Sequence, residues 1–314
     1  MTPGHMRLTR RPDPDDLRAL PKQSVVTIGT FDGVHVGHQR ILNRVLEEAR
    51  DRALPAVVFS FEPTPGEFFS SGTPPARLTR FREKFEALER FGVDWLFCPP
   101  FNATMESLGP DEFIEQHLVK TLGVKHLVVG DDFRFAKDRR GQVDDLQRVG
   151  GRCGFSVEQV PSVMENGNRV SSTGIRKLLA DGELSRAKKL LGRNYRMTGR
   201  VVGGQKLGKQ LGYPTANVNL NRRASPVGGI FAVRVEGLDA DLLDGVASVG
   251  TRPTIDGIEP VLEVHIFDFE RNIYGAYIQV EFVEKLRDEV KFPDLDSLTQ
   301  QMHIDAAQAR KILA

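Results

Sequence analysis

A glycine-rich loop that carries two histidines is the segment of this 314-residue chain best suited to chemistry. It reads TIGTFDGVHVGH from Thr27 to His38, and helical spacing follows it. Its glycines permit a tight turn and a close approach of the backbone to a ligand. The N-terminus of a helix that follows a strand binds anions, above all phosphate, and His35 and His38 could donate to phosphate oxygens. Two histidines that merely cap or pack a helix are the alternative.

A second candidate anion site reads RVSSTGIR from Arg169 to Arg176. Ser172 or Thr173 would cap a helix, and Arg176, one turn further on, could reach a phosphate as a forked donor. An ordinary capped helix with a surface arginine would give the same pattern. Neither segment has the GxxxxGK(S/T) pattern of a P-loop or the GxGxxG pattern of a dinucleotide fold.

A threonine and an asparagine two residues apart form a third candidate site. Thr215 and Asn217 follow Pro214, so on a strand their side chains leave from the same face. Their oxygens are hard ligands of the kind that Mg²⁺ prefers, and glycines such as Gly208 just before them could supply N–H groups to phosphates. A strand that simply ends in a turn would look similar.

Glu263 is a carboxylate within an apolar run, LEVHIFDF. In a strand its side chain and that of His265 leave from the face opposite to Leu262, Val264 and Ile266. Glu263 is therefore either a surface residue or a partly buried base.

The elements that must position these groups differ between the two halves of the chain. Up to about residue 163, short β-branched runs alternate with amphipathic helical segments, which predicts a parallel sheet covered by helices. The predicted strands are Ser24–Phe31, Ala56–Phe61, Val93–Cys98, Lys125–Gly130 and Phe155–Val160.

After about Leu191 the helical periodicity gives way to strand-like runs separated by Gly, Pro and Asn, which predicts a small closed β-barrel and then a C-terminal helix over 297–313. The predicted strands are Tyr195–Val202, Ile230–Val235, Gly245–Val249, Val261–Phe269 and Tyr277–Val283. The fold class is therefore α/β plus all-β.

Composition excludes several classes of protein. There are 43 Lys+Arg against 42 Asp+Glu, and the resulting net charge of +1 argues against binding of nucleic acid by bulk positive charge. The apolar runs are far shorter than the roughly 18 residues that cross a membrane, and the N-terminus lacks the apolar core of a signal peptide. The only two cysteines, Cys98 and Cys153, have no metal-binding spacing and fit a reducing, cytoplasmic location.

The motifs together resemble a known family. FDGVHVGH (31–38) and SSTGIR (171–176) are similar to the HxGH nucleotidylyltransferase superfamily. With GDDFRF (130–135), YPTAN (213–217), GTRPT (250–254), LEVHIFDF (262–269) and KLRDE (285–289), the chain resembles the prokaryotic bifunctional riboflavin kinase/FAD synthetase over nearly its whole length.

For the N-terminal half, the resemblance implies a Rossmann-like nucleotidylyltransferase domain over 1–183 that adenylylates FMN. The FMN phosphate would attack the α-phosphorus of ATP, giving FAD and pyrophosphate. Asp132 would lie on the flavin side of this site. Residues implied to bind ATP are Gly29, Phe31, Asp32, Gly33, His35, His38, Ser172, Thr173 and Arg176.

For the C-terminal half, the resemblance implies a riboflavin kinase barrel over 184–314. Glu263 would be the general base for the ribityl 5′-hydroxyl, Gly208, Thr215 and Asn217 would bind ATP and Mg²⁺, and Arg287 would contact the flavin. Mg²⁺ is the implied metal, with Thr215 and Asn217 as its ligands, and the partners are riboflavin, FMN and ATP, with no nucleic acid or membrane. Self-association stays open.

The chain departs from the family pattern at three positions. Thr64 stands where the family often has His, Ala136 where it often has Gly, and Gly203 where it often has His. Two alternatives remain: an adenylyltransferase whose barrel binds flavin without catalysis, and a non-catalytic RNA-binding barrel supported only by Arg222 and Arg223.

Overall fold

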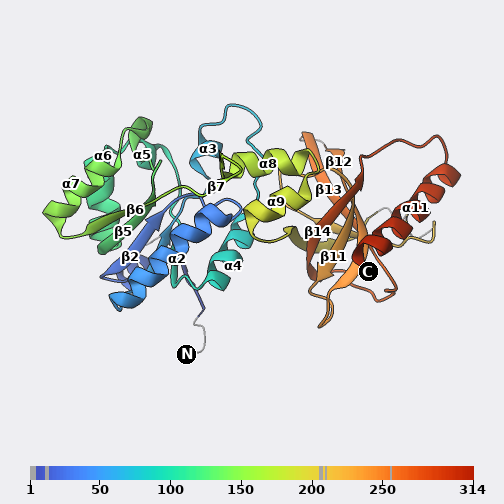
Figure 1. The fold of residues 1–314 in the computed structure, drawn as a ribbon, viewed down its shortest axis with the longest axis horizontal. Helices are drawn as coiled ribbons and strands as arrows, with labels where there is room; N and C mark the ends of the chain where they lie inside the picture. The colour runs from blue at the N-terminus through green and yellow to red at the C-terminus, as the bar shows by residue number, and fades with distance from the viewer. Residues whose placement is uncertain (1–4, 11–13, 205–207, 209–210, 255–256) are drawn as a thin grey trace. The chain divides into compact units, whose positions relative to one another are not determined.

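The computed structural model describes residues 5–10, 14–204, 208, 211–254 and 257–314, and Figure 1 draws its ribbon. The chain divides into two compact units. The first unit comprises residues 1–75 and 81–171, and the second comprises residues 76–80 and 172–314.

The first unit is built on a six-stranded parallel sheet in the order β1-β4-β3-β2-β5-β6. Residues on its central strands alternate between two apolar faces, as strands covered on both sides require. The predicted parallel sheet is therefore confirmed. Its strands are β1 (Arg7–Thr9), β2 (Ser24–Ile28), β3 (Ala56–Phe59), β4 (Trp95–Phe97), β5 (Val124–Gly130) and β6 (Ser156–Val160), and a hairpin of β7 (Met164–Glu165) and β8 (Asn168–Arg169) follows.

Helices cover both faces of this sheet (Figure 1). Val45 and Ala49 of α2 pack with Val25 and Val128 on one face. On the other face η1 and α7 pack against Val26 and its neighbours. The helical elements are α1 (Pro14–Ala19), α2 (Val36–Asp51), α3 (Pro65–Phe68), α4 (Phe81–Phe91), α5 (Ala103–Ser107), α6 (Pro110–Phe113), the π-helix η1 (Ile114–Thr121), the 3₁₀ turn η2 (Lys137–Arg139) and α7 (Val143–Cys153).

The strand order reverses direction next to β2. From β2 the chain moves outward to β3 and β4, and it then returns to add β5 on the other side of β2. In open α/β sheets, ligands bind at the carboxyl ends of strands at such a switch point. The loop that leaves β2 ends at the predicted His35, the predicted His38 lies in the first turn of α2, and the loop that leaves β5 carries the predicted Asp132.

The second unit is a closed barrel of six antiparallel strands in the order β10-β13-β12-β11-β14-β9, with β9 pairing back to β10. Closure pairs every edge strand, so the predicted barrel is confirmed. Its strands are β9 (Tyr195–Val202), β10 (Ala216–Asn219), β11 (Gly229–Glu236), β12 (Leu243–Thr254), β13 (Gly257–Ile266) and β14 (Tyr277–Arg287).

Among the described residues, the second unit also contains three longer helices and a short strap. They are α8 (Ser172–Ala180), α9 (Leu184–Leu191) and the C-terminal α11 (Leu295–Leu313), whose Ala309 and Leu313 pack against the barrel near Ala232. The strap, residues 76–80, receives hydrogen bonds from the barrel: the Tyr195 hydroxyl donates to the Leu78 carbonyl at 3.2 Å, and Arg222 donates to the Arg77 carbonyl at 2.5 Å.

Some local expectations were wrong. Helix α8 begins at Ser172, so Ser172 and Thr173 lie in its first turn instead of capping it. A separate finding is that the helix that begins at Pro110 continues as a π-helix from Ile114 to Thr121, a change that a 3.6-residue spacing does not reveal.

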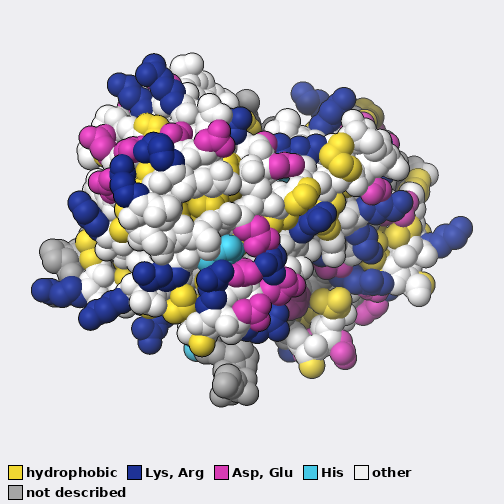
Figure 2. All heavy atoms as spheres, turned by 60° about the vertical axis from the view of Figure 1, so that its left-hand side comes forward, with side chains coloured by type: hydrophobic (Ala, Val, Ile, Leu, Met, Phe, Trp, Pro, Cys, Tyr) yellow, Lys and Arg dark blue, Asp and Glu magenta, His cyan; other side chains and the backbone are white. Residues whose placement is uncertain are grey.

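On the face drawn in Figure 2, basic and acidic side chains are interspersed, as the net charge of +1 leads one to expect. Among the described residues, no helix is both long enough and apolar enough to cross a membrane.

Candidate active sites

The loop after β2 has an unusual backbone. Phe31 has φ 50° and Val34 has φ 42°, values that residues other than glycine rarely adopt. Gly33, between them, has φ 85°. Such strained residues cluster at functional sites, where the surrounding structure holds them in place. Phe31, Val34 and Asp32 are all buried. The loop is therefore a fixed turn that brings the chain from the sheet edge into α2.

His35 caps α2, which fixes its tautomer. The His38 backbone N–H donates to His35 Nδ1 at 3.3 Å, so Nδ1 carries the lone pair and Nε2 carries the proton. Gly37 makes room for this arrangement, since a Cβ there would lie 3.1 Å from the His35 ring. His35 therefore caps α2 through Nδ1 and carries its ring proton at Nε2, and its role toward phosphate stays a prediction.

His38 stacks on His35, with ring centroids 3.6 Å apart and planes 16° apart. Its Nδ1 is buried and has no hydrogen-bond partner among the described residues. Burial, followed by the nearby His35, Lys84 and Arg169, holds the pKa of His38 well below its usual range. His38 is therefore neutral near pH 7 and can act through an N–H donor.

The loop after β5 carries Asp132 beside the histidine loop. Asp132 forms an ion pair with Arg169 of β8, and this hydrogen bond raises the pKa of Arg169. The neighbouring Asp131 accepts hydrogen bonds from the Ser162 hydroxyl at 2.6 Å and backbone N–H at 2.9 Å, which lower its pKa. Arg169 acts electrostatically on His38, so the first unit groups Asp132, Arg169 and the histidine pair.

The second predicted anion segment lies in the other unit. Ser172, Thr173 and Arg176 belong to α8, and Arg176 Nε donates to the Ala76 carbonyl of the strap at 2.6 Å. One edge of this guanidinium is therefore used within the second unit. The phosphate-binding role of the three residues stays a prediction.

Phenylalanines that motif reasoning missed gather at the carboxyl edge of the sheet. Phe61 follows β3 and Phe101 follows β4. Their rings meet edge-on, with centroids 5.5 Å apart. The ring centroids of Phe68 and Phe101 are 5.2 Å apart. Phe68 is 39% exposed and Phe69 is 62% exposed. The signal in the sequence was Phe61 at the end of one predicted strand and Phe101 three residues after the next.

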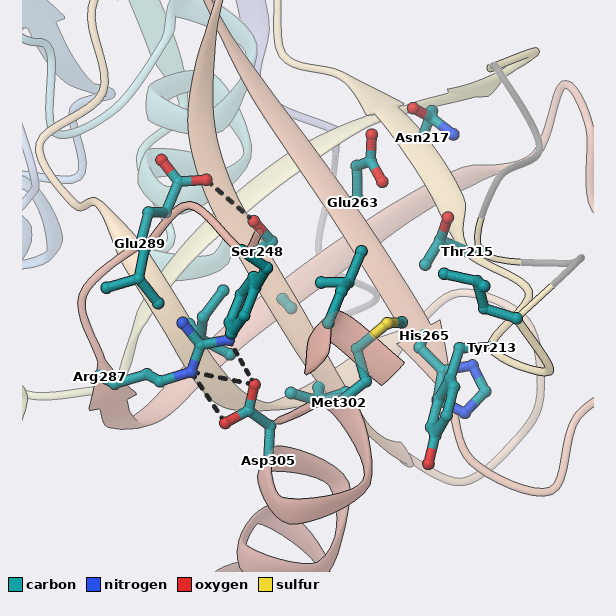
Figure 3. A pocket seen from close by; sticks show the side chains of 18 residues that line it. Tyr213, Thr215, Asn217, Ser248, Glu263, His265, Arg287, Glu289, Met302 and Asp305 are labelled. Atoms are coloured by element: carbon teal, nitrogen blue, oxygen red, sulfur yellow. Dashed lines mark hydrogen bonds and ion pairs between the residues drawn. The ribbon is translucent and has the colours of Figure 1, made fainter. Parts of the chain in front are cut away.

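A cavity of about 310 Å³ opens in the second unit (Figure 3). Its two ends differ in chemistry. Thr215, Asn217 and Glu263 lie together at one end, and the Arg287–Asp305 ion pair lies at the other (Figure 3). Apolar side chains that line it are Leu211, Ile230, Val246, Val290, Phe292, Leu298 and Met302.

The barrel register places Glu263 between two polar neighbours. Glu263 of β13 pairs with Asn217 of β10 and with Ser248 of β12, so the three side chains share one face. Leu262 and Val264 are fully buried while Glu263 is half-buried, which confirms the predicted alternation. Glu263 therefore faces the cavity.

Gly208, Thr215 and Asn217 meet at the polar end of the cavity. A Cβ on Gly208 would lie 2.3 Å from the Tyr213 carbonyl and 3.3 Å from Thr215 Oγ1, so the backbone passes too close for any side chain. Likewise, a Cβ on Gly204 would lie 2.2 Å from the Asn217 amide nitrogen. The donor set is a hydroxyl and an amide oxygen beside a carboxylate, which fits a Mg²⁺ ion that brings phosphate ligands of its own.

Arg287 is held firmly at the end of the cavity opposite to Thr215 and Asn217. Its Nε and Nη2 donate to both carboxylate oxygens of Asp305 at 2.7–3.1 Å, and Gln301 also donates to Asp305 at 2.9 Å. Asp305 is only 4% exposed. The pair fastens α11 to the end of β14.

Tyr213, His265 and His303 form a second connection beside the cavity. His265 Nδ1 donates to the Pro214 carbonyl at 2.9 Å, and the Tyr213 hydroxyl is hydrogen-bonded to His303 of α11. Burial raises the pKa of Tyr213, so its hydroxyl stays protonated. These contacts hold the segment that leads into Thr215.

The three departures from the family pattern have distinct local settings. Thr64 is the N-cap of α3 and forms a capping box with Glu67. At Gly203 a Cβ would meet no atom within 4 Å. Ala136 has φ 61° and ψ −170°, a conformation that glycine adopts readily.

Replacing Ala136 with glycine is therefore expected to stabilise the first unit. Relief of the backbone strain at Ala136 should raise the free energy of unfolding by about 1–3 kcal/mol. Glycine also gives the unfolded chain more freedom, which lowers the free energy of unfolding by about 0.4–1 kcal/mol. Chemical denaturation should show a free energy of unfolding higher by about 1 kcal/mol. An unchanged or lower value would mean that the loop does not strain Ala136.

Comparison with known proteins relates each unit to one enzyme family. The FAD synthetase family model matches residues 17–174, and the riboflavin kinase family model matches residues 191–313. A protein of Escherichia coli K12, named bifunctional riboflavin kinase/FMN adenylyltransferase, is 47% identical over 297 residues, which cover 94% of this chain and 95% of that protein. The chain belongs to the bifunctional riboflavin kinase/FMN adenylyltransferase family.

Other relatives also match this chain over nearly its whole length. Proteins with the same name from Haemophilus influenzae and Pseudomonas fluorescens are 45% and 46% identical and cover 91% and 95% of this chain, and 92% and 96% of their own lengths. A solved structure from Streptococcus pneumoniae, described as a macrolide-efflux protein, is 33% identical with a TM-score of 0.84 and covers 97% of this chain and 99% of its own. The family resemblance that the motifs carried is confirmed.

Proposed function

We propose that this chain converts riboflavin into FMN in its second unit and FMN into FAD in its first unit, with ATP as the co-substrate of both steps. The observation that carries the proposal is the position of Glu263. It places a carboxylate beside oxygen ligands at one end of a cavity that is also lined by apolar side chains, among them Val246, Phe292 and Met302. A flavin that enters with its ring in the apolar part presents its sugar alcohol chain to that carboxylate.

In the kinase step, Glu263 takes the proton of the ribityl 5′-hydroxyl. The freed oxygen attacks the γ-phosphorus of ATP in line, a new P–O bond forms, and ADP leaves with the electron pair of the bond that breaks. Gly208, Thr215 and Asn217 would hold ATP and Mg²⁺, and the ion would neutralise phosphate charge. Arg287, positioned by Asp305, is the candidate contact for the polar edge of the flavin.

In the adenylyltransferase step, a phosphate oxygen of FMN attacks the α-phosphorus of ATP and pyrophosphate leaves. His35 donates through Nε2–H, and His38 lies stacked against it. The turn of Gly29, Phe31, Asp32 and Gly33 holds the backbone at the sheet edge. For Ser172, Thr173 and Arg176, which belong to α8 of the second unit, binding of the outer phosphates is proposed from the family resemblance alone. Donors aimed at developing charge in a site that excludes water are typically the largest contribution to such a reaction.

The flavin of this second step would bind beside Asp132 and the phenylalanines at the sheet edge. Phe61 and Phe68 each meet Phe101 edge-on, and the three rings offer aromatic surface to a flat ring. Asp132, held by Arg169, supplies a polar group next to it. A cytoplasmic location is part of the proposal, and the presence of two free cysteines supports it.

Incubation with riboflavin and Mg·ATP, followed by chromatographic separation of the flavins, tests the proposal. FMN should appear first and FAD after it. FAD made from FMN but not from riboflavin would favour the alternative of a flavin-binding, inactive barrel. Retarded RNA in a gel-shift, with no ATP consumed in the presence of riboflavin, would favour an RNA-binding barrel.

The division of the chemistry between residues 1–183 and 184–314 is also a proposal, and fragments can test it. A fragment of residues 172–314 retains α8 but loses the strap, which leaves the buried Tyr195 hydroxyl without its acceptor at Leu78. We expect this fragment to unfold cooperatively, about 1–3 kcal/mol less stable for each lost buried partner, and to make FMN but no FAD. A folded fragment that makes no FMN would contradict the division.

A further inference from the structure

Lys84 is a buried lysine for which the two reactions so far have no use. It lies in α4, three residues after Phe81 and four before Leu88, so it occupies the inward face of the helix. Only 3% of its surface is exposed. Lysine is almost never buried this deeply unless its ammonium group is paired or hydrogen-bonded, because desolvation of the charge is costly.

The ammonium group is anchored at the carboxyl edge of the sheet. Nζ donates to the Thr30 carbonyl at 3.1 Å and to the Ser60 hydroxyl at 2.9 Å. Thr30 follows β2 and opens the histidine loop, while Ser60 follows β3 and is fully buried. Lys84 therefore joins the ends of two neighbouring strands, and one of its hydrogen bonds is made to the loop that leads to His35.

This anchor has a consequence for the backbone of the loop. A trans peptide holds its C=O and the following N–H on opposite sides of one plane. The bond to the Thr30 carbonyl therefore also fixes the direction of the Phe31 N–H. Phe31 is the first residue of the loop with positive φ, at 50°, and a strained turn of this kind persists only where its surroundings hold it.

The charge of Lys84 also acts on His38. His38 faces His35 on its own helix, Lys84 on α4 and Arg169 on β8, and all three act to lower the pKa of His38. A cation fixed by two hydrogen bonds needs no reorganisation when negative charge develops on phosphate oxygens. Lys84 is thus placed to act through both geometry and charge.

We propose that Lys84 is a positioning residue for adenylyl transfer: its ammonium group orients the loop that carries His35 and His38 and supplies a fixed positive charge behind it. This inference rests on the proposed function of the first unit. The second unit catalyses its own step, so riboflavin phosphorylation serves as an internal control in the same polypeptide.

The decisive variant is Lys84→Met, which keeps the length of the side chain and removes the ammonium group. We expect kcat for FAD formation from FMN to fall about 10–100-fold, because small misplacements of reacting groups cost up to about 10²-fold, while FMN formation from riboflavin stays unchanged. The acid limb of the pH–rate profile should move to higher pH, since loss of a nearby cation raises the pKa of His38. Lys84→Arg should keep the acid limb in place.

The matched control is Arg90→Met, which removes a positive charge from an exposed position of the same helix and should change neither kcat nor the pH profile. Ser60→Ala provides a second test if Lys84→Met does not fold, as judged by circular dichroism. It removes one acceptor and leaves the cation, so we expect a smaller loss of kcat for FAD formation, about threefold to tenfold on the same scale.

Wild-type kcat and pH profile in folded Lys84→Met would overturn the inference. If that variant does not fold, wild-type kcat in Ser60→Ala would overturn it. The failure of the proposed function gives a different result: the unaltered enzyme would then make no FAD from FMN, whatever residue stands at position 84.

Discussion

Glu263→Gln is expected to abolish riboflavin phosphorylation and to leave the conversion of FMN into FAD intact. Glutamine keeps the shape of the side chain and its place between Asn217 and Ser248, but it cannot take the proton of the 5′-hydroxyl. Loss of a general base typically lowers the rate by about 10²–10⁴-fold. The measurement is the separate initial rate of FMN formation from riboflavin and of FAD formation from FMN.

The control is Glu259→Gln on the same strand. The Glu259 side chain is 44% exposed, and its Oε2 lies 3.7 Å from Arg252 Nη2. It should phosphorylate riboflavin at the wild-type rate. If Glu263→Gln does the same, Glu263 is structural and the base is elsewhere.

His38→Ala should have the opposite effect, with FMN accumulating and FAD formation lowered about 10²–10³-fold, the cost of removing a preorganised donor. The single change is preferable to one at His35, because His35 also caps α2 and its removal would cost about 1 kcal/mol of helix stability. Chromatography of the flavins after incubation with riboflavin and Mg·ATP measures both rates.

His5→Ala serves as the control, since the His5 side chain is fully exposed. It should form FAD at the wild-type rate. Wild-type FAD output from His38→Ala would remove His38 from the mechanism and leave the stacked pair without a catalytic role.

Local patterns predicted the architecture because they report what a segment buries. The alternation around Glu263 reappears as buried Leu262 and Val264 with Glu263 facing the cavity. Strand β9 spans the predicted Tyr195–Val202, and the helical spacing after Gly37 marks α2, which begins at Val36. Spacing of two or 3.6 residues is a property of a few neighbours in the chain, so it is visible without the tertiary fold.

The groups that support these side chains could not be predicted in the same way. Lys84 meets Thr30 and Ser60 across 54 and 24 residues of chain, and Asp305 meets Arg287 from a different element. Such pairs depend on how elements pack, and no local period encodes that. The cap of α8 was misplaced because several consecutive hydroxyl residues, Ser171 to Thr173, are all suitable caps.

The central claim is that one chain contains two separate sites, each of which performs one step. Mixing Glu263→Gln with His38→Ala tests it most directly, with riboflavin and Mg·ATP as the only substrates. Each variant alone should make almost no FAD: Glu263→Gln should leave riboflavin unchanged, and His38→Ala should stop at FMN. The mixture should make FAD, because FMN released by one variant is a substrate for the other. If the mixture makes no more FAD than either variant alone, although both variants are folded, the assignment of the two steps to these two sites is contradicted.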